Sequence, residues 1–192
     1  MMNERMATTS IKEYTKQFSR MILAARTMRK IKRDNLIDKQ FIERIMLAVT
    51  QVNGCSICSY EHTKIAFKSG ISQLEIDEIL SGDFENIPDD QKMAVIFAQH
   101  YAYTRGNPDG NALFKLRAYY GREKAEAIRK VIDIIMFGNA YGIAWLNFKD
   151  RLKNKPVKKS RLSRELVIIA APFLLIVLPL LIIVITVKTI RK

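Results

Sequence analysis

This 192-residue chain has few cysteines, histidines, tryptophans and prolines. It contains two cysteines, two histidines, one tryptophan and five prolines. Cys55 and Cys58 lie within four residues of each other, so they cannot hold distant segments together. A disulfide framework of the kind found in small secreted proteins is therefore excluded. The two cysteines are instead candidates for a local redox or metal site. An apolar share of 48% with 27% charged residues is typical of a globular chain with a single core.

Acidic residues are rare toward the C-terminal end. Residues 151–192 hold ten of the 32 Lys and Arg residues but one of the 19 Asp and Glu residues. The formal net charge of +13 therefore belongs mainly to this end, and residues 1–150 have the charge balance of an ordinary soluble domain. We expect anionic membrane lipids rather than nucleic acid as the partner of this basic segment, because it flanks a long apolar run.

Residues 166–187 contain no charged residue, no amide and no glycine. As a helix this segment would be about 33 Å long, which matches a hydrocarbon core of about 30 Å. Seven Lys and Arg residues precede it in residues 151–164, and three follow it, so the positive-inside rule puts the preceding domain in the cytoplasm. The sequence predicts a basic juxtamembrane linker at 151–165, one C-terminal transmembrane helix at 166–187 and a short tail at 188–192.

Strand-like alternation and internal repeats are absent from residues 1–150. Apolar residues instead recur at intervals of three and four, which indicates helices, and capping or helix-breaking residues separate them. The expected helices cover residues 11–33, 38–52, 55–69, 73–81, 89–104, 109–120 and 122–148. The prediction is an all-α fold, with an N-terminal amphipathic helix in residues 1–35 and a helical domain in residues 36–150.

Four residues of the helical region point to redox chemistry. Cys55 and Cys58 lie one turn apart at a predicted helix start, close enough for a disulfide, and the helix N-terminus favours the nucleophilic thiolate. His62 follows Cys58 by four residues, so the two side chains share a helix face. Glu43 precedes Cys55 by twelve residues. An antiparallel crossing through the turn at residues 53–54 would return its carboxylate to the thiols, where it could act as a base.

The order Glu-x11-Cys-x2-Cys-x3-His in a helical chain resembles the alkylhydroperoxidase D-like branch of the carboxymuconolactone decarboxylase superfamily. The resemblance covers roughly residues 36–148 and is strongest over residues 43–80, where Asn-Gly precedes the first cysteine and Thr follows the histidine. It implies an alkylhydroperoxidase D-like helical fold and a thiol-dependent peroxidase or disulfide reductase of peroxiredoxin type. It also implies an external thiol reductant in place of a bound cofactor, no metal, and assembly as a homo-oligomer.

The resemblance assigns a role to each of these residues. Cys58 corresponds to the cysteine that attacks the peroxide, and Cys55 to the more exposed cysteine that resolves the sulfenic acid as a disulfide. Glu43 and His62 correspond to the residues that relay the proton. Some peroxidases of the family have a second histidine just before the second cysteine, where this chain has Ile57. This departure weakens the case for high peroxidase activity but leaves dithiol exchange intact.

Two other interpretations remain open at this point. Cys55, Cys58 and His62, with Glu43 or water, could bind zinc. Alternatively, the domain could be a membrane-tethered scaffold whose cysteines only sense redox state. An aromatic stripe on the last helix of the domain is expected to form core or a subunit interface, and Gly138 and Gly142 would permit close helix contact there. The members of the stripe are Met136, Phe137, Tyr141, Trp145 and Phe148.

Overall fold

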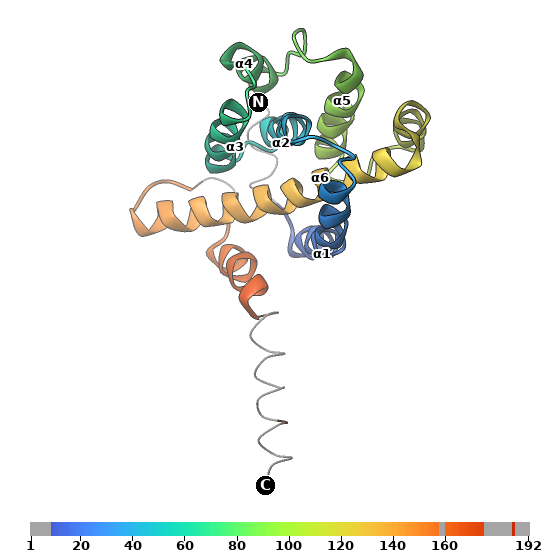
Figure 1. The fold of residues 1–192 in the computed structure, drawn as a ribbon. Coiled ribbons are helices and arrows are strands. Elements are labelled where there is room, and N and C mark those ends of the chain that lie inside the picture. Colours follow the sequence, from blue (N-terminus) through green and yellow to red (C-terminus); the bar gives the residue numbers. More distant parts are fainter. Residues whose placement is uncertain (1–8, 158–159, 175–185, 187–192) are drawn as a thin grey trace.

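The computed structural model describes residues 9–157, 160–174 and 186 (Figure 1). Within these ranges all regular structure is helical and no strand occurs, as predicted. The labelled helices are α1 (Ile11–Arg33), α2 (Lys39–Asn53), α3 (Ser56–Lys68), α4 (Gln73–Ser81), α5 (Asp89–Tyr103) and α6 (Gly110–Leu152). Residues 162–174 form a further helical segment.

Local capping groups fix where the helices begin. Ser10 and Glu13 form a reciprocal capping box at α1, in which each side chain accepts a hydrogen bond from the other residue's backbone N–H. Asp38 and Ser72 accept backbone N–H groups in the same way at the starts of α2 and α4. These bonds satisfy donors that have no partner within the helix. They explain why the starts of these helices agree with the sequence prediction to within one residue.

Gly121 divides the long helix α6. Its φ of 73° and ψ of 169° lie outside the helical region, and a positive φ is strained for any residue with a side chain. The sequence predicted separate helices on either side of this glycine, and the structure has them running on across a kink. No atom outside its immediate neighbours lies near the position of a Cβ here, so the requirement is for backbone conformation and not for space.

Helix α6 forms a spine with a different set of helices on each side. Helices α2 to α5 cover one side, whereas α1 and residues 162–174 lie on the other (Figure 1). α2 sits at the centre of the larger group and contacts α3, α4, α5 and α6. Its apolar residues, including Ile45, Leu47 and Val49, are completely buried together with Ile128 and Ile132 of α6. The first helix, α1, packs against α6 of the same chain. The sequence had left open whether it packs within its own subunit or on a neighbour.

The segment that precedes and begins the predicted membrane span is attached to the helical domain. The Arg151 side chain donates hydrogen bonds to the Glu165 carboxylate at 2.9 and 3.2 Å, and Glu165 is only 1% exposed. The Tyr14 hydroxyl donates to the backbone carbonyl of Ile168 at 2.9 Å, and the Ile168 side chain is buried. The helical segment 162–174 is thus docked on α1 and α6 over its first two turns.

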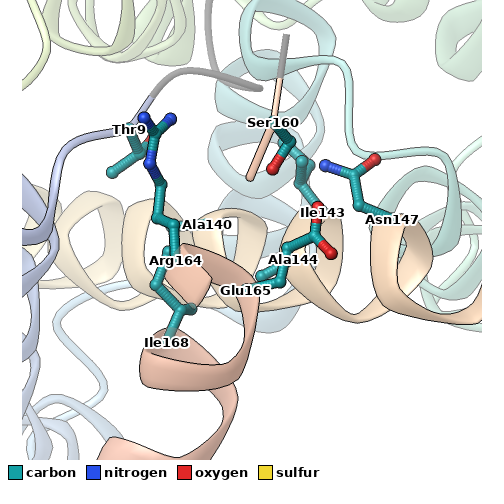
Figure 2. Close-up of a pocket in the computed structure, with 9 residues that line it drawn as sticks. All are labelled: Thr9, Ala140, Ile143, Ala144, Asn147, Ser160, Arg164, Glu165 and Ile168. Carbon is teal, nitrogen blue, oxygen red and sulfur yellow. The ribbon is translucent and has the colours of Figure 1, made fainter. Parts of the chain in front are cut away.

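The small cavity where this segment meets α6 does not offer a ligand site (Figure 2). Its volume is about 10 Å³, roughly the space that one water molecule requires. The cavity is therefore a small gap left where the segment packs against α6. Its lining residues are Thr9, Ala140, Ile143, Ala144, Asn147, Ser160, Arg164, Glu165 and Ile168.

Most of the predicted C-terminal membrane span, residues 175–185 and 187, lies outside the described residues. Within the described ranges, one helix is long and apolar enough to cross a membrane by length and composition, with a mean hydropathy of 1.3. This helix is α6, in the middle of the chain and not at the predicted C-terminal position. Because 44% of its apolar stretch is buried inside the domain, it fits equally well the core helix of a soluble protein.

The buried ion pair between Arg44 and Glu75 joins α2 to α4 and gives a stability prediction. Glu75→Gln keeps the shape of the side chain but leaves the Arg44 guanidinium without a counter-charge, so we expect a loss of about 3–5 kcal/mol in the free energy of unfolding. Urea denaturation of the detergent-solubilised full chain measures it. The matched control is Glu61→Gln, which breaks an exposed pair with Lys64 and should cost less than about 1 kcal/mol. Equal losses in the two variants would show that burial of the pair is unimportant.

Candidate redox site

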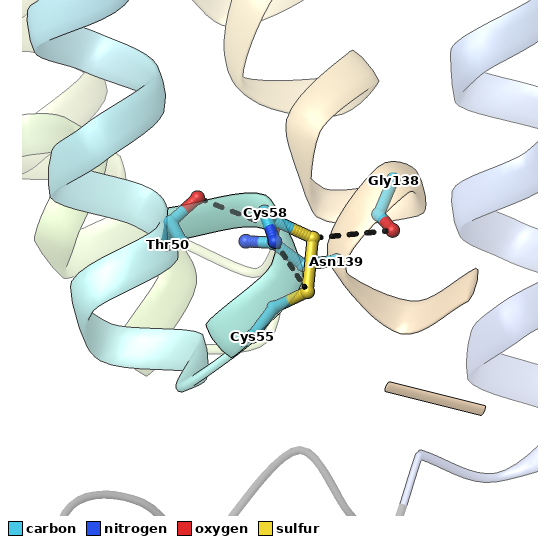
Figure 3. The surroundings of a disulfide bond; sticks show 5 residues. All are labelled: Thr50, Cys55, Cys58, Gly138 and Asn139. Carbon is cyan, nitrogen blue, oxygen red and sulfur yellow. Dashed lines mark hydrogen bonds between the residues drawn. A yellow bond between two sulfur atoms is a disulfide. The ribbon is translucent and has the colours of Figure 1, made fainter. Parts of the chain in front are cut away.

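A disulfide joins Cys55 to Cys58 at the N-terminus of α3 (Figure 3). Their Cα atoms are 5.3 Å apart, as expected for cysteines separated by one helical turn. Cys55 is the N-cap residue, and its Sγ accepts a hydrogen bond from the backbone N–H of Cys58 at 3.4 Å. The predicted pair is therefore formed, and one of its sulfurs also caps the helix.

The turn at residues 53–54 directs the chain into this position. Asn53 is the last residue of α2, and Gly54 ends the helix in the left-handed conformation with a φ of 71°. The Gly54 N–H still bonds to the carbonyl of Thr50, so the reversal is tight. Cys55 then adopts extended backbone angles and starts α3 directly. The antiparallel crossing expected from the sequence follows from this single glycine.

The backbone of α6 forms the surface against which the disulfide packs. A Cβ atom added to Gly142 would lie 2.8 Å from the Sγ of Cys55 and 2.9 Å from the Sγ of Cys58. The carbonyl oxygen of Gly138, one turn earlier, lies 3.8 Å from the Sγ of Cys58 (Figure 3). The close contact predicted at these two glycines thus involves the redox pair itself. Absence of a side chain at position 142 is a steric requirement of this arrangement.

Two polar contacts between α2 and α6 support the site from behind. The Thr50 hydroxyl donates to Oδ1 of Asn139 at 3.2 Å, and the Asn53 amide donates to Sδ of Met136 at 3.3 Å. Thr50, Asn53 and Asn139 are all buried, so these contacts fix the end of α2 relative to α6. Thr50 and Asn139 were not among the site residues predicted from the sequence. Neither has a spacing signal, because the two residues are 89 positions apart.

Glu43 and His62 form the second half of the candidate site. Oε2 of Glu43 lies 2.8 Å from Nδ1 of His62, and their side chains are only 7% and 18% exposed. Glu43 reaches from α2 and His62 from α3, one turn beyond Cys58. Glu43 is not a solvated partner of its neighbour Arg44, whose guanidinium pairs with Glu75 instead. In the described part of the chain no hydrogen bond connects either residue directly to a sulfur atom.

The exposure of the two cysteines is the reverse of what the family resemblance implied. Cys55, expected to be the more exposed, is 1% exposed, whereas Cys58 is half-buried. The reason lies in the tertiary packing, because the N-cap position of α3 faces α6 at Gly142 and the Cys55 side chain is enclosed there. The expectation for Cys55 is therefore wrong, and Cys58 is the more exposed residue of the pair.

The zinc interpretation gains no support from this geometry. Among the described residues, no group of three or more His, Cys, Asp and Glu side chains is arranged to hold a metal ion. The two sulfurs are bonded to each other, and Nδ1 of His62 is engaged by Glu43. The donors that a tetrahedral site would need are thus committed to other bonds in this state.

The aromatic stripe of α6 is divided between core and surface. Phe137 packs on Tyr14 and Phe18 of α1, with ring centroids 5.4 and 5.3 Å apart. Trp145 is 43% exposed and contacts Phe148, so this end of the stripe is left on the surface. The Phe137 end of the stripe packs against the core, so the prediction of core or subunit interface is confirmed there.

Comparison with known proteins identifies a family for this region. Residues 17–84 match the model of the carboxymuconolactone decarboxylase family, in agreement with the sequence resemblance. This family includes alkylhydroperoxidase-like oxidoreductases as well as decarboxylases. The matched region contains Glu43, Cys55, Cys58 and His62, but it ends before α5 and α6. No curated protein and no solved structure gives a significant match.

The packing of the disulfide on α6 predicts a selective effect of Gly142→Ala. The added Cβ would overlap both sulfurs, and two separate thiols can rotate away more easily than a bonded pair, so the disulfide is destabilised relative to the dithiol. We expect the equilibrium constant for its formation in a glutathione buffer to fall about tenfold, which raises the reduction potential of the pair by about 30 mV. Gly138→Ala is the matched control, because a Cβ there meets only the Ile135 side chain at 3.9 Å. An unchanged potential in Gly142→Ala would contradict the proposed contact.

Proposed function

We propose that this chain, whose residues 17–84 match the model of the carboxymuconolactone decarboxylase family, is a thiol-dependent peroxidase or disulfide reductase. The observation that carries the proposal is the Cys55–Cys58 disulfide at a helix N-terminus, with the buried Glu43–His62 pair one turn away. A dithiol at such a position cycles between thiol and disulfide, and a neighbouring carboxylate and imidazole can move the proton that the cycle requires.

The peroxidase reaction assigns one role to each of the four residues. The thiolate of Cys58, the more exposed cysteine, attacks the peroxide; an S–O bond forms, the O–O bond breaks, and an alcohol or water leaves with a proton. The Cys55 thiol then attacks the resulting sulfenic acid, which releases water and forms the disulfide. Glu43 and His62 accept the thiol proton and return it to the leaving oxygen. An external thiol supplies the two electrons that restore the dithiol, so no bound cofactor is needed.

Dithiol exchange has support of its own beside peroxide reduction. Ile57 occupies the position where some peroxidases of the family have a second histidine, and its side chain is 39% exposed and apolar. It cannot donate or accept a proton at the peroxide, whereas exchange between a thiol and a disulfide needs no such group. A redox-sensing scaffold is the remaining alternative, and it differs by turning over slowly.

We also propose that the chain is a single-pass membrane protein with its catalytic domain in the cytoplasm. The apolar run at 166–187 and the excess of basic residues before it support this topology. The docked segment 162–174 contains the start of the run, and it packs on Ala140, Ala144 and neighbouring residues of α6. At about 100° per residue, Gly138 and Gly142 lie on the opposite face of α6. The redox pair is then turned away from the membrane side, which favours substrates dissolved in the cytoplasm over lipid hydroperoxides.

A homo-oligomer is the expected assembly of the domain. The exposed end of the aromatic stripe, Trp145 with Phe148, offers an apolar surface for contact with a second copy. The other partners that we propose are a peroxide or disulfide substrate, a thiol reductant protein and membrane lipids.

Turnover measurements on cysteine and glutamate variants test the catalytic proposal. The full chain in detergent should consume an organic hydroperoxide in the presence of a dithiol reductant. Cys58→Ser should abolish this activity, and Cys55→Ser should leave a sulfenic acid at Cys58 that dimedone traps. Glu43→Gln should slow turnover by about 10²–10⁴-fold, the usual contribution of a general base. Glu61→Gln is the control on the exposed face of α3, and full activity in Cys58→Ser would refute the role assignment.

The membrane proposal predicts resistance to alkaline carbonate extraction. The full chain should stay in the membrane pellet, and Val177→Arg combined with Leu180→Arg should release it, because each charge near the centre of a span costs about 2.5–3.5 kcal/mol. Leu152→Arg is the control, since Leu152 is an exposed residue outside the span. Release of the unaltered chain by carbonate would exclude an integral membrane anchor.

A further inference from the structure

The two cysteines of the disulfide differ in their exposure to solvent. Cys55 is 1% exposed and lies against α6 at Gly142, whereas Cys58 is half-buried. A thiolate that opens a disulfide must contact the sulfur that it attacks, so access decides which of the two is attacked. On this criterion the point of entry is Cys58.

The surroundings of the two sulfurs differ in the same sense. Sγ of Cys55 occupies the N-cap position of α3 and accepts the backbone N–H of Cys58, an arrangement that stabilises a negative charge. Sγ of Cys58 faces the carbonyl oxygen of Gly138 at 3.8 Å. In the dithiol state this oxygen can accept a hydrogen bond from the Cys58 thiol. The electron pair that departs to Cys55 is stabilised there by the helix N-terminus.

We propose that the external reductant of this protein, a thiol, attacks the disulfide at Cys58 and that Cys55 is the leaving group. This assignment rests on the proposed thiol-disulfide function and adds the order in which the sulfurs react. It goes beyond the roles implied by the family resemblance, which made Cys55 the more exposed cysteine. Because the reductant must approach Cys58, the docking surface for a reductant protein surrounds the exposed start of α3, where Ser56, Ile57 and Tyr60 are also exposed.

Electrons and atoms balance in two exchange steps. The incoming thiolate forms a bond to Sγ of Cys58 while the Cys55–Cys58 bond breaks, and its electron pair stays on Sγ of Cys55 as a thiolate at the helix N-terminus. A second thiolate of the reductant then attacks the incoming sulfur. The reductant leaves as a disulfide, and Cys58 departs as a thiolate that takes up a proton, which the Gly138 carbonyl can accept in a hydrogen bond. Two electrons pass from the reductant to the cysteine pair.

Mapping of the mixed disulfide tests the order directly. The oxidised full chain in detergent is mixed with glutathione, quenched in acid within the reaction time, and digested for peptide mass analysis. We expect glutathione on Cys58 to exceed glutathione on Cys55 by roughly tenfold or more. Equal labelling, or labelling mainly on Cys55, would overturn the proposal.

Single-cysteine variants provide a second measurement. Cys55→Ser leaves Cys58 alone and keeps a good N-cap residue, and Cys58→Ser leaves Cys55 alone. With the aromatic disulfide reagent dithiobis(nitrobenzoate), Cys58 should react roughly tenfold faster than Cys55 in the folded chains. In urea the two rates should converge, because the difference comes from the fold. Faster reaction of Cys55 in the folded state would contradict the proposal.

These readouts separate this inference from the proposed function. Neither the mapping nor the reagent rates require peroxide turnover. Preferred labelling of Cys58 without any peroxide or disulfide turnover would refute the enzyme and retain the order of the sulfurs. Turnover with preferred labelling of Cys55 would do the reverse.

Discussion

The contact between the α3 disulfide and the bare backbone of α6 at Gly142 is the constraint on which the arrangement of this site depends. Both sulfurs lie where a single methyl group on α6 would overlap them. The contact encloses Cys55, leaves Cys58 as the more exposed cysteine and places a carbonyl oxygen of α6 beside its sulfur. A pair of cysteines that is symmetric in the sequence thereby becomes asymmetric in access and in electrostatic surroundings.

Two consecutive residues of α2 show how burial separates structural from chemical roles. Arg44 turns toward α4 and forms a buried pair with Glu75, which ties the two helices together. Glu43 turns toward α3 and meets the imidazole of His62 close to the redox pair. Because successive residues of a helix point about 100° apart, adjacent charged side chains can serve different neighbours. The local sequence Glu-Arg conceals this division, since it suggests one exposed ion pair.

The spine formed by α6 also orders the molecule from one side to the other. The redox pair occupies the face of α6 that α3 covers, and the helical segment leading toward the C-terminus occupies the opposite face. Hydrogen bonds from Tyr14 and Arg151 fix that segment to α1 and α6, the second of them through Glu165.

The helices, where they begin, and the four candidate residues could be predicted from the sequence alone. Caps such as Ser10 and breakers such as Gly54 act within a few residues, so their effect can be predicted from local chemistry. The pairing of Glu43 with His62 was also predictable, because one tight turn connects their helices. Which of the two cysteines is enclosed could not be predicted, because it depends on packing against Gly142, which lies more than 80 residues further along the chain. The same holds for Thr50 with Asn139, and the physical reason is that packing between distant helices leaves no periodic signal in the chain.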